Sequence, residues 1–413
     1  MSSPQSQSAQ TEPYLVLTAQ TLYAPEVIPG PASIVFAGPR IHAIWRDTDA
    51  QAARQRARDA QLDPSTQFID LGQLRLAPGY IDLHDHGFHG HDITTGSREE
   101  IEAMAAELPR SGTTAFFATI ASTGREESAR QVRFCAEAAE GQPDTSAEIL
   151  GIRLEGPFIS TVKKGAQYAP AIRAPDPDEM RELARIGGGR IRLVDYAPEE
   201  DTGDRLLAAL VGLGILPCIG HTNATYEQAI HAIDGGARHC AHLFNAMSPL
   251  DHRAPGVPGA LLTDHRPTVE MVADGIHLNP TTLKLIVEAR GIDNVALITD
   301  AVGVAGLADG EYEFVNRKVI VSNGAVRLEN GTIAGSTLTM ERAVRNMVAL
   351  AGCSWSDAIR MATMTPARIA GVADRKGQLV PGADADVLAL DDDGNVQRVW
   401  TRGHNAYDRT QER

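Results

Sequence analysis

The chain has 413 residues, of which 43% are hydrophobic and 22% charged, and these proportions are typical of a globular protein with a large core. Its formal net charge of −15 argues against nucleic acid or an anionic membrane as a partner, although a local basic pocket could still bind a small anion. No apolar run approaches the roughly 20 residues that a transmembrane helix needs.

The first residues and the cysteines indicate where the protein works. Residues 1–12 are polar, rich in Gln and Ser and without a signal-peptide core, so we expect a disordered tail there. The four cysteines are scattered along the chain without a CxxC pair, which fits a reducing compartment better than a disulfide scaffold or a thiolate zinc site. We therefore expect a cytoplasmic protein.

Short β-rich runs separated by Gly and Pro turns occupy residues 13–76. A stretch rich in Arg, Ala and Gln at residues 51–61 interrupts them and fits either a loop or a short helix. Strand patterns return at residues 375–413, so we expect the two ends of the chain to build one small, discontinuous β-sandwich domain. The expected strands are 14–17, 32–36, 40–45, 67–71, part of 377–390, and 396–401.

Strand and helix patterns alternate between residues 77 and 374, which predicts an α/β fold, a (β/α)8 barrel of the TIM type. Ser97 and Glu100 have the spacing of a capping box at a helix start, and we expect a later helix to begin at Thr222 or Asn223. The expected strands are 113–120, 149–154, 191–194, 214–219, 268–272 and 295–299, with 237–243 as a further candidate.

An apolar run at residues 76–83 ends in His84-Asp85-His86, just before Gly87. If the run is a strand, its side chains alternate, and His84 and His86 point to the same side, close enough to bind one cation. Parallel α/β barrels place their chemistry where their strands end, which is the position of this pair. A single pair of this kind is as often an ordinary surface pair, so its meaning depends on the residues that follow.

Four further ligand-type residues lie at or just after the ends of other expected strands, namely Glu155, His221, His242 and Asp300. Each has an ordinary explanation by itself, as a salt-bridge partner, a helix cap or a turn cap. Chance explains a single residue of this kind at a strand end much better than it explains all of them at the strand ends of one barrel. Imidazole and carboxylate ligands together suit zinc, iron, manganese or cobalt better than a hard ion such as calcium.

Six motifs follow one another along the chain. In this order they resemble the N-acetylglucosamine-6-phosphate deacetylase family of the amidohydrolase superfamily, and the resemblance extends from about residue 14 to about residue 400. The motifs are His-x-His at 84–86, Glu-Gly-Pro at 155–157, Gly-His-Thr-Asn-Ala at 220–224, His-Leu-Phe-Asn-Ala-Met at 242–247, Ala-Asp-Gly-Ile-His at 273–277 and Thr-Asp-Ala at 299–301.

The resemblance implies a centre of one or two divalent metal ions per subunit, with zinc as the first expectation and iron, manganese or cobalt as alternatives. Glu155 stands where other branches of the superfamily carry a carboxylated lysine, which disfavours hydantoinase- or dihydroorotase-like chemistry. The implied ligands are Glu155, His221 and His242 for the principal ion, and His84 and His86 for a second ion.

The reaction implied by the resemblance is hydrolysis of the acetamide of N-acetyl-D-glucosamine 6-phosphate to D-glucosamine 6-phosphate and acetate. A water activated by the metal attacks the acetamide carbonyl. Asp300 takes the proton of this water as general base and returns it to the departing amine as general acid. The metal, together with His277, stabilises the oxyanion.

The matching motifs also imply residues for the sugar phosphate. Asn245 and Ala246 match contacts to the phosphate, and His277 matches a sugar-binding histidine. Arg253 matches an arginine that reaches the phosphate from the neighbouring subunit, which implies a homodimer. Gln167 is a departure, because many relatives carry histidine there; glutamine can still donate to a phosphate oxygen but carries no charge.

Three alternatives stay open. The same fold could act on N-acetylgalactosamine 6-phosphate or another N-acetylhexosamine, and Gln167 with Arg253 is the feature that bears on this choice. A different amidohydrolase reaction, such as deamination or opening of a cyclic amide, is disfavoured by Glu155. A catalytically inactive sugar-phosphate sensor is disfavoured by the complete set of metal-binding and acid–base residues.

Overall fold

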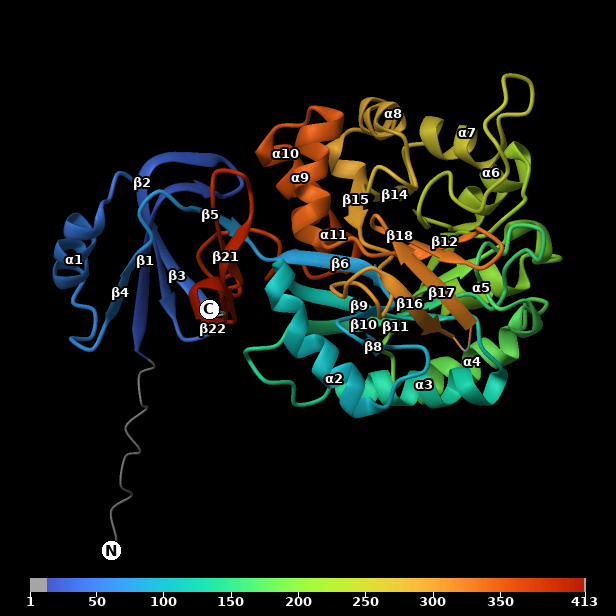
Figure 1. Cartoon of the computed structure of the whole chain (residues 1–413), viewed down its shortest axis with the longest axis horizontal. Coiled ribbons are helices and arrows are strands. Elements are labelled where there is room, and N and C mark those ends of the chain that lie inside the picture. The colour runs from blue at the N-terminus through green and yellow to red at the C-terminus, as the bar shows by residue number, and fades with distance from the viewer. Residues whose placement is uncertain (1–12, 316, 412–413) are drawn as a thin grey trace, which may run out of the picture.

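The computed structural model describes residues 13–315 and 317–411. These residues form a small β-domain and a larger α/β barrel, which lie side by side (Figure 1). The disordered tail predicted for residues 1–12 falls outside the described residues. Among the described helices, none is long and apolar enough to cross a membrane.

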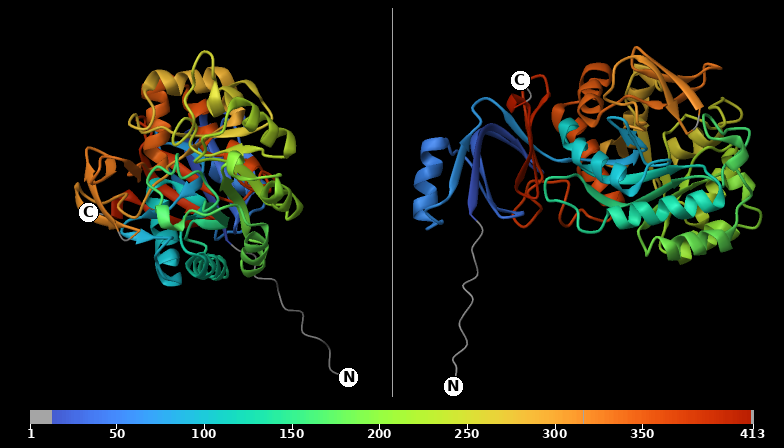
Figure 2. Two further views of the ribbon diagram at one scale, coloured as in Figure 1. Left: turned by 90° about the vertical axis from the view of Figure 1, so that its right-hand side faces the viewer. Right: turned by 60° about the horizontal axis from the view of Figure 1, so that its bottom comes forward.

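The small domain is built from both ends of the chain, and the blue and red segments lie together in it (Figures 1 and 2). β5 (Arg75–Pro78) links the two parts, because it pairs in parallel with β1 (Tyr14–Tyr23) and antiparallel with β20 (Val387–Leu390). Phe36 and Trp400 are buried in its common core. The discontinuous β-domain predicted from the sequence is confirmed. Its other strands are β2 (Val27–Ala37), β3 (Arg40–Trp45), β4 (Gln67–Asp70), β21 (Val396–Thr401) and β22 (His404–Asp408).

The stretch at residues 51–61, for which loop and helix were both open, forms α1 (Ala50–Asp59). Asp49 caps this helix, because its Oδ1 accepts hydrogen bonds from the backbone N–H groups of residues 51 and 52 at 3.0 and 2.8 Å. Ala53 packs into a small cluster with Val16 and Val35 of the sheet. The domain boundaries that we expect after residues 76 and 374 stay a prediction.

Eight parallel strands form the barrel, which confirms the fold predicted from the alternating pattern. β6 (Tyr80–Asp85) and β15 (Val295–Ile298) meet at its seam, where the backbone N–H of Asp300 donates to the carbonyl of His84 at 2.9 Å. Every residue of these two strands is buried, as expected for parallel strands covered by helices. The other barrel strands are β9 (Thr113–Ala121), β10 (Glu148–Glu155), β11 (Ile191–Tyr196), β12 (Leu216–Ile219), β13 (His239–Cys240) and β14 (Thr268–Val272).

Helices connect the strands and cover the outside of the barrel (Figure 2). α2 (Arg98–Glu107) begins at the predicted capping box, in which Ser97 Oγ accepts from the Glu100 N–H and the Glu100 carboxylate accepts from the Ser97 N–H. The further helices are α3 (Arg125–Ala138), α4 (Pro177–Ile186), α5 (Arg205–Gly212), α7 (Gly256–Thr263), α8 (Pro280–Arg290), α9 (Met340–Ala351), α10 (Trp355–Ala362) and α11 (Met364–Ile369). Short 3-10 helices span Leu108–Ser111, Ala169–Ala171, Pro198–Glu200, Ile292–Asn294 and Arg409–Gln411.

The helix expected to begin at Thr222 or Asn223 begins later, as α6 (Tyr226–Gly235) with Thr225 as its cap. The Thr222 hydroxyl donates to Glu199 at 2.5 Å, and the backbone N–H of Asn223 donates to the same carboxylate at 2.5 Å. The helix start is set instead by a capping box, in which Thr225 Oγ1 accepts from the Gln228 N–H and the Gln228 side chain accepts from the Thr225 N–H, so the predicted start was wrong.

A four-stranded antiparallel sheet that we did not expect from the sequence follows β15 (Figure 1). The chain carries the pattern of a β-hairpin here. In β17 (Arg317–Ser322), Lys318 and Ile320 are exposed while Val319 and Val321 are buried, and Asn-Gly at 323–324 makes a tight turn. The strands are β16 (Gly310–Phe314), β17 (Arg317–Ser322), β18 (Ala325–Leu328) and β19 (Ile333–Ser336). A smaller hairpin of β7 (Gly87–Phe88) and β8 (His91–Asp92) follows β6.

Candidate metal centre and pocket

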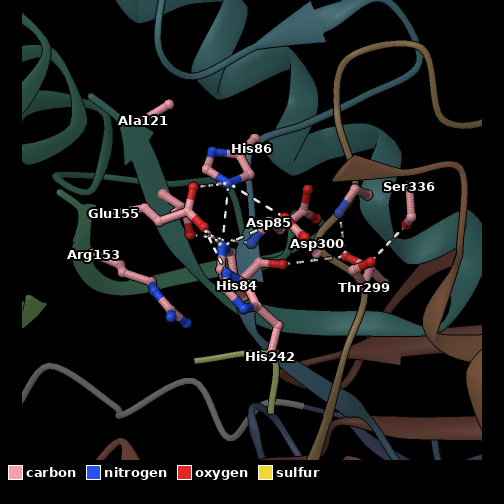
Figure 3. A network of polar contacts seen from close by, with 12 residues as sticks. His84, Asp85, His86, Ala121, Arg153, Glu155, His242, Thr299, Asp300 and Ser336 are labelled. Atoms are coloured by element: carbon pink, nitrogen blue, oxygen red, sulfur yellow. Dashed lines mark hydrogen bonds and ion pairs between the residues drawn. The ribbon is translucent and has the colours of Figure 1, made fainter. Parts of the chain in front are cut away.

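The end of β6 brings His84 and His86 together as the alternation of a strand predicts. Their Nε2 atoms are 3.2 Å apart, and the two residues are 0% and 2% exposed. The pair is therefore buried, which removes the interpretation as an ordinary surface pair. Figure 3 shows both rings turned toward the carboxylate of Glu155.

Glu155, the last residue of β10, lies between this pair and two further histidines. Its Oε1 is 3.3 Å from His84 Nε2, 3.0 Å from His221 Nε2 and 3.1 Å from His242 Nε2. Its Oε2 is 3.2 Å from His86 Nε2. One carboxylate thus joins two groups of histidines that come from three different strand ends.

Asp300 completes the cluster from the end of β15. Its Oδ1 is 3.5 Å from Nε2 of both His84 and His86 (Figure 3). Asp300 has a positive φ of 49°, and His221 and His242 have positive φ values of 45° and 20°. Such backbone is unfavourable for residues other than glycine and persists where the surrounding structure holds it, often at functional sites.

Both carboxylates of the cluster are ionised at neutral pH. Burial raises the pKa of Glu155, but His84 and His221 outweigh it and hold the pKa of this carboxyl well below its ordinary value. Burial also opposes ionisation of Asp300, yet His84 and His86 lower its pKa to about 2. The negative charges fit a role as cation ligands or proton acceptors.

Two groups of side chains fit divalent metal ions. In each group the ligand atoms lie within 4.8 Å of one another and all residues are buried. The histidine Nε2 atoms converge on a shared carboxylate, and imidazole with carboxylate is the donor set of zinc and similar ions. The groups are His84, His86, Glu155 and Asp300, and Glu155, His221 and His242.

A buried carboxylate behind the histidines was not identified from the sequence. Glu270 in β14 has its Oε2 3.2 Å from His84 Nδ1, and the same oxygen accepts from the backbone N–H of His242 at 3.2 Å. Its Oε1 is 2.9 Å from His239 Nε2 and also accepts from Arg153. Glu270 therefore connects one histidine of each group.

Arg153 extends this network, with Nη2 2.9 Å from an Asp195 oxygen. The side chains of Arg153, Asp195 and Glu270 are fully buried. A sequence signal existed, because a charged residue in an apolar strand covered on both faces needs an internal partner. The identity of that partner was not readable, since the three residues belong to three separate strands.

A pocket of about 260 Å³ adjoins the cluster. The ends of barrel strands, the segments around residues 166 and 246, and the β16–β19 sheet form its walls. It brings together most of the predicted site residues. Those that line it are His86, Glu155, Gln167, His221, His242, Asn245, Ala246, His277 and Asp300.

Gln167 contacts the candidate metal centre directly. Its Nε2 donates to Glu155 Oε2, and its Oε1 accepts from the backbone N–H of Ser122 at 2.8 Å. The side-chain amide is thereby fixed at both ends and orients the Glu155 carboxylate. The predicted contact of Gln167 to a phosphate stays a prediction.

His277 and Arg253 are placed differently. His277 lines the pocket with Nδ1 2.7 Å from Asp274 Oδ2. Burial lowers the pKa of this imidazole, but Asp274 more than compensates, and the pKa of His277 is raised. Arg253 is exposed and does not line the pocket of its own chain. Its predicted role in a neighbouring subunit stays a prediction.

The barrel with histidines and carboxylates at its strand ends defines a class of protein. A model of the amidohydrolase family matches residues 75–406, which is most of the chain.

Named relatives within this class are sugar deacetylases. The chain is 38% identical over 334 residues to N-acetylglucosamine-6-phosphate deacetylase of Bacillus subtilis (strain 168), covering 80% of this chain and 84% of that protein. It is 36% identical over 332 residues to N-acetylgalactosamine-6-phosphate deacetylase of Escherichia coli O157:H7, covering 80% and 87%.

A solved structure has the same architecture. It is a mutant N-acetyl-D-glucosamine-6-phosphate deacetylase from Mycobacterium smegmatis in complex with N-acetyl-D-glucosamine-6-phosphate. The TM-score is 0.86 at 35% identity, covering 95% of this chain and 99% of that one. The chain therefore belongs to the N-acetylglucosamine-6-phosphate deacetylase family of the amidohydrolases.

Proposed function

We propose that this protein is a metal-dependent deacetylase that hydrolyses the acetamide of N-acetyl-D-glucosamine 6-phosphate to D-glucosamine 6-phosphate and acetate. The observation that carries the proposal is the Glu155 carboxylate, which joins two buried histidine groups beside Asp300 at the wall of a pocket. Similarity to N-acetylglucosamine-6-phosphate deacetylases over most of the chain supports the choice of substrate.

The metal ligands in this proposal come from both histidine groups. A bound divalent ion lowers the pKa of a water and polarises a carbonyl oxygen. Zinc is the ion that we propose, since imidazole and carboxylate groups are common zinc ligands. Glu155, His221 and His242 would hold the principal ion, and His84 and His86 a second one.

Asp300 transfers the proton in the proposed reaction. Its ionised carboxylate lines the pocket and accepts the proton of the attacking water, then returns it to the departing amine. His277, oriented by Asp274, donates a hydrogen bond toward the acetamide oxygen or the sugar. An Asp300→Asn variant, which cannot accept this proton, is expected to lose at least about 100-fold in kcat. Full activity of this variant would exclude the role.

The phosphate end of the substrate is assigned to Asn245 and Ala246, which line the same pocket, and to Arg253 of a neighbouring subunit. This assignment requires a homodimer. The exposed position of Arg253, outside the pocket of its own chain, is compatible with a reach into another subunit. Four free cysteines support a reducing location such as the cytoplasm.

A second candidate substrate is N-acetylgalactosamine 6-phosphate. It is favoured by 36% identity to a relative named for that activity, close to the 38% of the gluco-type relative. The two sugars differ only in the configuration of one hydroxyl, so a few contacts in the pocket decide between them.

The deciding experiment is a deacetylation assay with N-acetylglucosamine 6-phosphate, its galacto epimer and unphosphorylated N-acetylglucosamine, with the metal content measured on the same sample. Preference for the gluco phosphate is the expected result. Preference for the epimer would keep the mechanism and change the substrate. Absence of hydrolysis of all three sugars by metal-loaded protein would refute the proposed function.

A further inference from the structure

Arg317, the first residue of β17, is a basic side chain in the pocket wall to which the proposed function assigns no role. Its Nη2 donates to the backbone carbonyl of Ala166, and its Nε is buried without a hydrogen-bond partner among the described residues. Its cross-strand neighbour Phe314 lies against the ring of His86, with ring centroids 6.4 Å apart. This end of the β16–β19 sheet therefore lies directly against the candidate metal centre.

The guanidinium of Arg317 has no negative partner within the described parts of the chain. It is the only arginine or lysine among the residues described as lining the pocket. Burial lowers its pKa, and the group that acts in the opposite direction is the phenol of Tyr168 rather than a carboxylate. A half-buried cation without a counter-ion is costly, and an anion entering the pocket would remove that cost.

The position of Arg317 matches the expected position of the phosphate. Its partner Ala166 follows Gly165, and a Cβ added to Gly165 would lie 3.7 Å from the Cβ of Ala246. The segment that Arg317 contacts is therefore packed beside Ala246, one of the two residues assigned to the phosphate. The planar fork of a guanidinium suits the oxygens of a phosphate group.

We propose that Arg317 is a specificity-determining residue that binds the 6-phosphate of the substrate from within the same subunit. This inference rests on the proposed function for the identity of the sugar and extends it to a recognition group on the β16–β19 sheet. Arg317 supplies the positive charge that Gln167 lacks. The own-chain Arg317 and the neighbour's Arg253 would then bind one phosphate from two sides.

A purely structural role predicts a different outcome. The hydrogen bond to Ala166 ties the β16–β19 sheet to the neighbouring loop, and its loss would disturb the pocket for every substrate alike. A phosphate-binding role affects only substrates that carry the phosphate. The comparison of phosphorylated with unphosphorylated sugar therefore separates the two explanations.

The test uses the metal-loaded full chain with Arg317→Met, Arg317→Lys and the control Lys318→Met. Lys318 is the next residue of β17, is exposed and pairs with Glu311 at 2.9 Å, so its loss removes a charge from the same strand outside the pocket. Kinetic constants are measured with N-acetylglucosamine 6-phosphate and N-acetylglucosamine. Binding of inorganic phosphate is measured by calorimetry, and thermal unfolding shows that each variant is folded.

For Arg317→Met we expect KM for the phosphorylated sugar to rise about 10- to 100-fold. The variant loses hydrogen bonds between a guanidinium and a phosphate, and hydrogen bonds between charged groups are stronger than those between neutral groups. We expect kcat/KM for the unphosphorylated sugar to change by less than about 3-fold, Arg317→Lys to recover part of the loss, and Lys318→Met to behave as wild type. An equal loss for both sugars, or no loss for the phosphorylated one, overturns the proposal.

Failure of the proposed function can be distinguished from failure of the proposal for Arg317. If the wild type hydrolyses none of the sugars, the deacetylase assignment fails, and phosphate calorimetry alone decides on Arg317. Weaker phosphate binding by Arg317→Met than by Lys318→Met would then still support an anion site. Equal phosphate binding by the two variants would overturn it.

Discussion

At the level of single residues, the orientation of the Glu155 carboxylate depends on Gln167. The amide nitrogen of Gln167 donates to Glu155 Oε2, which leaves Oε1 facing His221 and His242. The amide oxygen accepts from Ser122, so the side chain cannot rotate without losing both hydrogen bonds. This arrangement makes Gln167 a positioning residue for the candidate metal centre.

Replacing Gln167 tests this role. Gln167→Leu removes the donor to Glu155 and leaves the buried N–H of Ser122 without an acceptor. We expect the free energy of unfolding to fall by about 1–3 kcal/mol and the metal affinity to fall with it. Gln167→His keeps a donor and should retain most of the bound metal. Metal content after dialysis and denaturant unfolding are the measurements, and a Leu variant with wild-type metal content would contradict the role.

At the level of elements, β10 and β14 support the centre through the buried network of Arg153 and Glu270. These charges are fully buried, and they pair with each other, with Asp195 and with His84 and His239. Carboxylates that accept from the outer nitrogen of a metal-binding histidine orient its ring. Glu270 has this position toward His84.

The Glu270→Gln variant is expected to bind the divalent metal about 10- to 100-fold more weakly, because the amide orients His84 less firmly and no longer neutralises Arg153. The matched control is Glu288→Gln, since Glu288 is exposed on α8 and forms a 3.8 Å ion pair with Lys284. Competition with a chelator, followed by the metal that stays bound, is the measurement. Equal affinities of the two variants would exclude a supporting role for Glu270.

At the level of the whole molecule, an ion-pair cluster connects the barrel with the chain segment that returns to the small domain. Arg375 Nη2 is 2.6 Å from one oxygen of Glu148 at the start of β10, and Lys376 Nζ is 2.9 Å from the other. Lys376 is 2% exposed and also pairs with Asp384 and Asp386. The cluster joins parts of the chain that are more than two hundred residues apart.

This cluster predicts a pH dependence of stability. Burial raises the pKa of Glu148, but Arg375 and Lys376 outweigh it and lower the pKa from 4.5 to about 2. A carboxyl whose pKa is lower in the folded state stabilises the fold above its unfolded pKa, and this contribution is lost as pH falls from about 5 toward 2. Glu148→Gln should therefore be less stable than wild type at pH 7, by up to about 3 kcal/mol. Urea unfolding at pH 7 and at pH 3.5 measures the difference, which must shrink at the lower pH.

The proposed dimer makes a prediction about mixed subunits. Asp300→Asn and Arg253→Ala are each expected to be nearly inactive as homodimers. If Arg253 serves the neighbouring pocket, a mixed dimer has one pocket with both defects and one with neither. When the two variants are mixed in denatured form and refolded together, about half of the dimers are mixed. The sample should then recover up to about a quarter of the wild-type activity. A mixture that stays as inactive as its components would contradict a role of Arg253 in the neighbouring pocket.

Much of the barrel and of the candidate centre could be predicted from the sequence, because both depend on local patterns. Apolar runs of strand length mark the strands, and a ligand-type residue directly after such a run lies at the strand's end. In a parallel barrel all these ends meet at one edge, so the sequence order of Glu155, His221, His242 and Asp300 was enough to predict a common site.

The tertiary structure alone decided the rest, because it depends on contacts between distant segments. α6 begins at the capping box of Thr225, Arg153 pairs with Asp195 and with Glu270 across the barrel, and Gln167 turns toward Glu155. The β16–β19 sheet carried hairpin signals, but nothing in its residues showed that it would bring Arg317 into the pocket. Periodicity along a chain determines which face of an element is buried, whereas the partner on that face is determined only when the elements pack together.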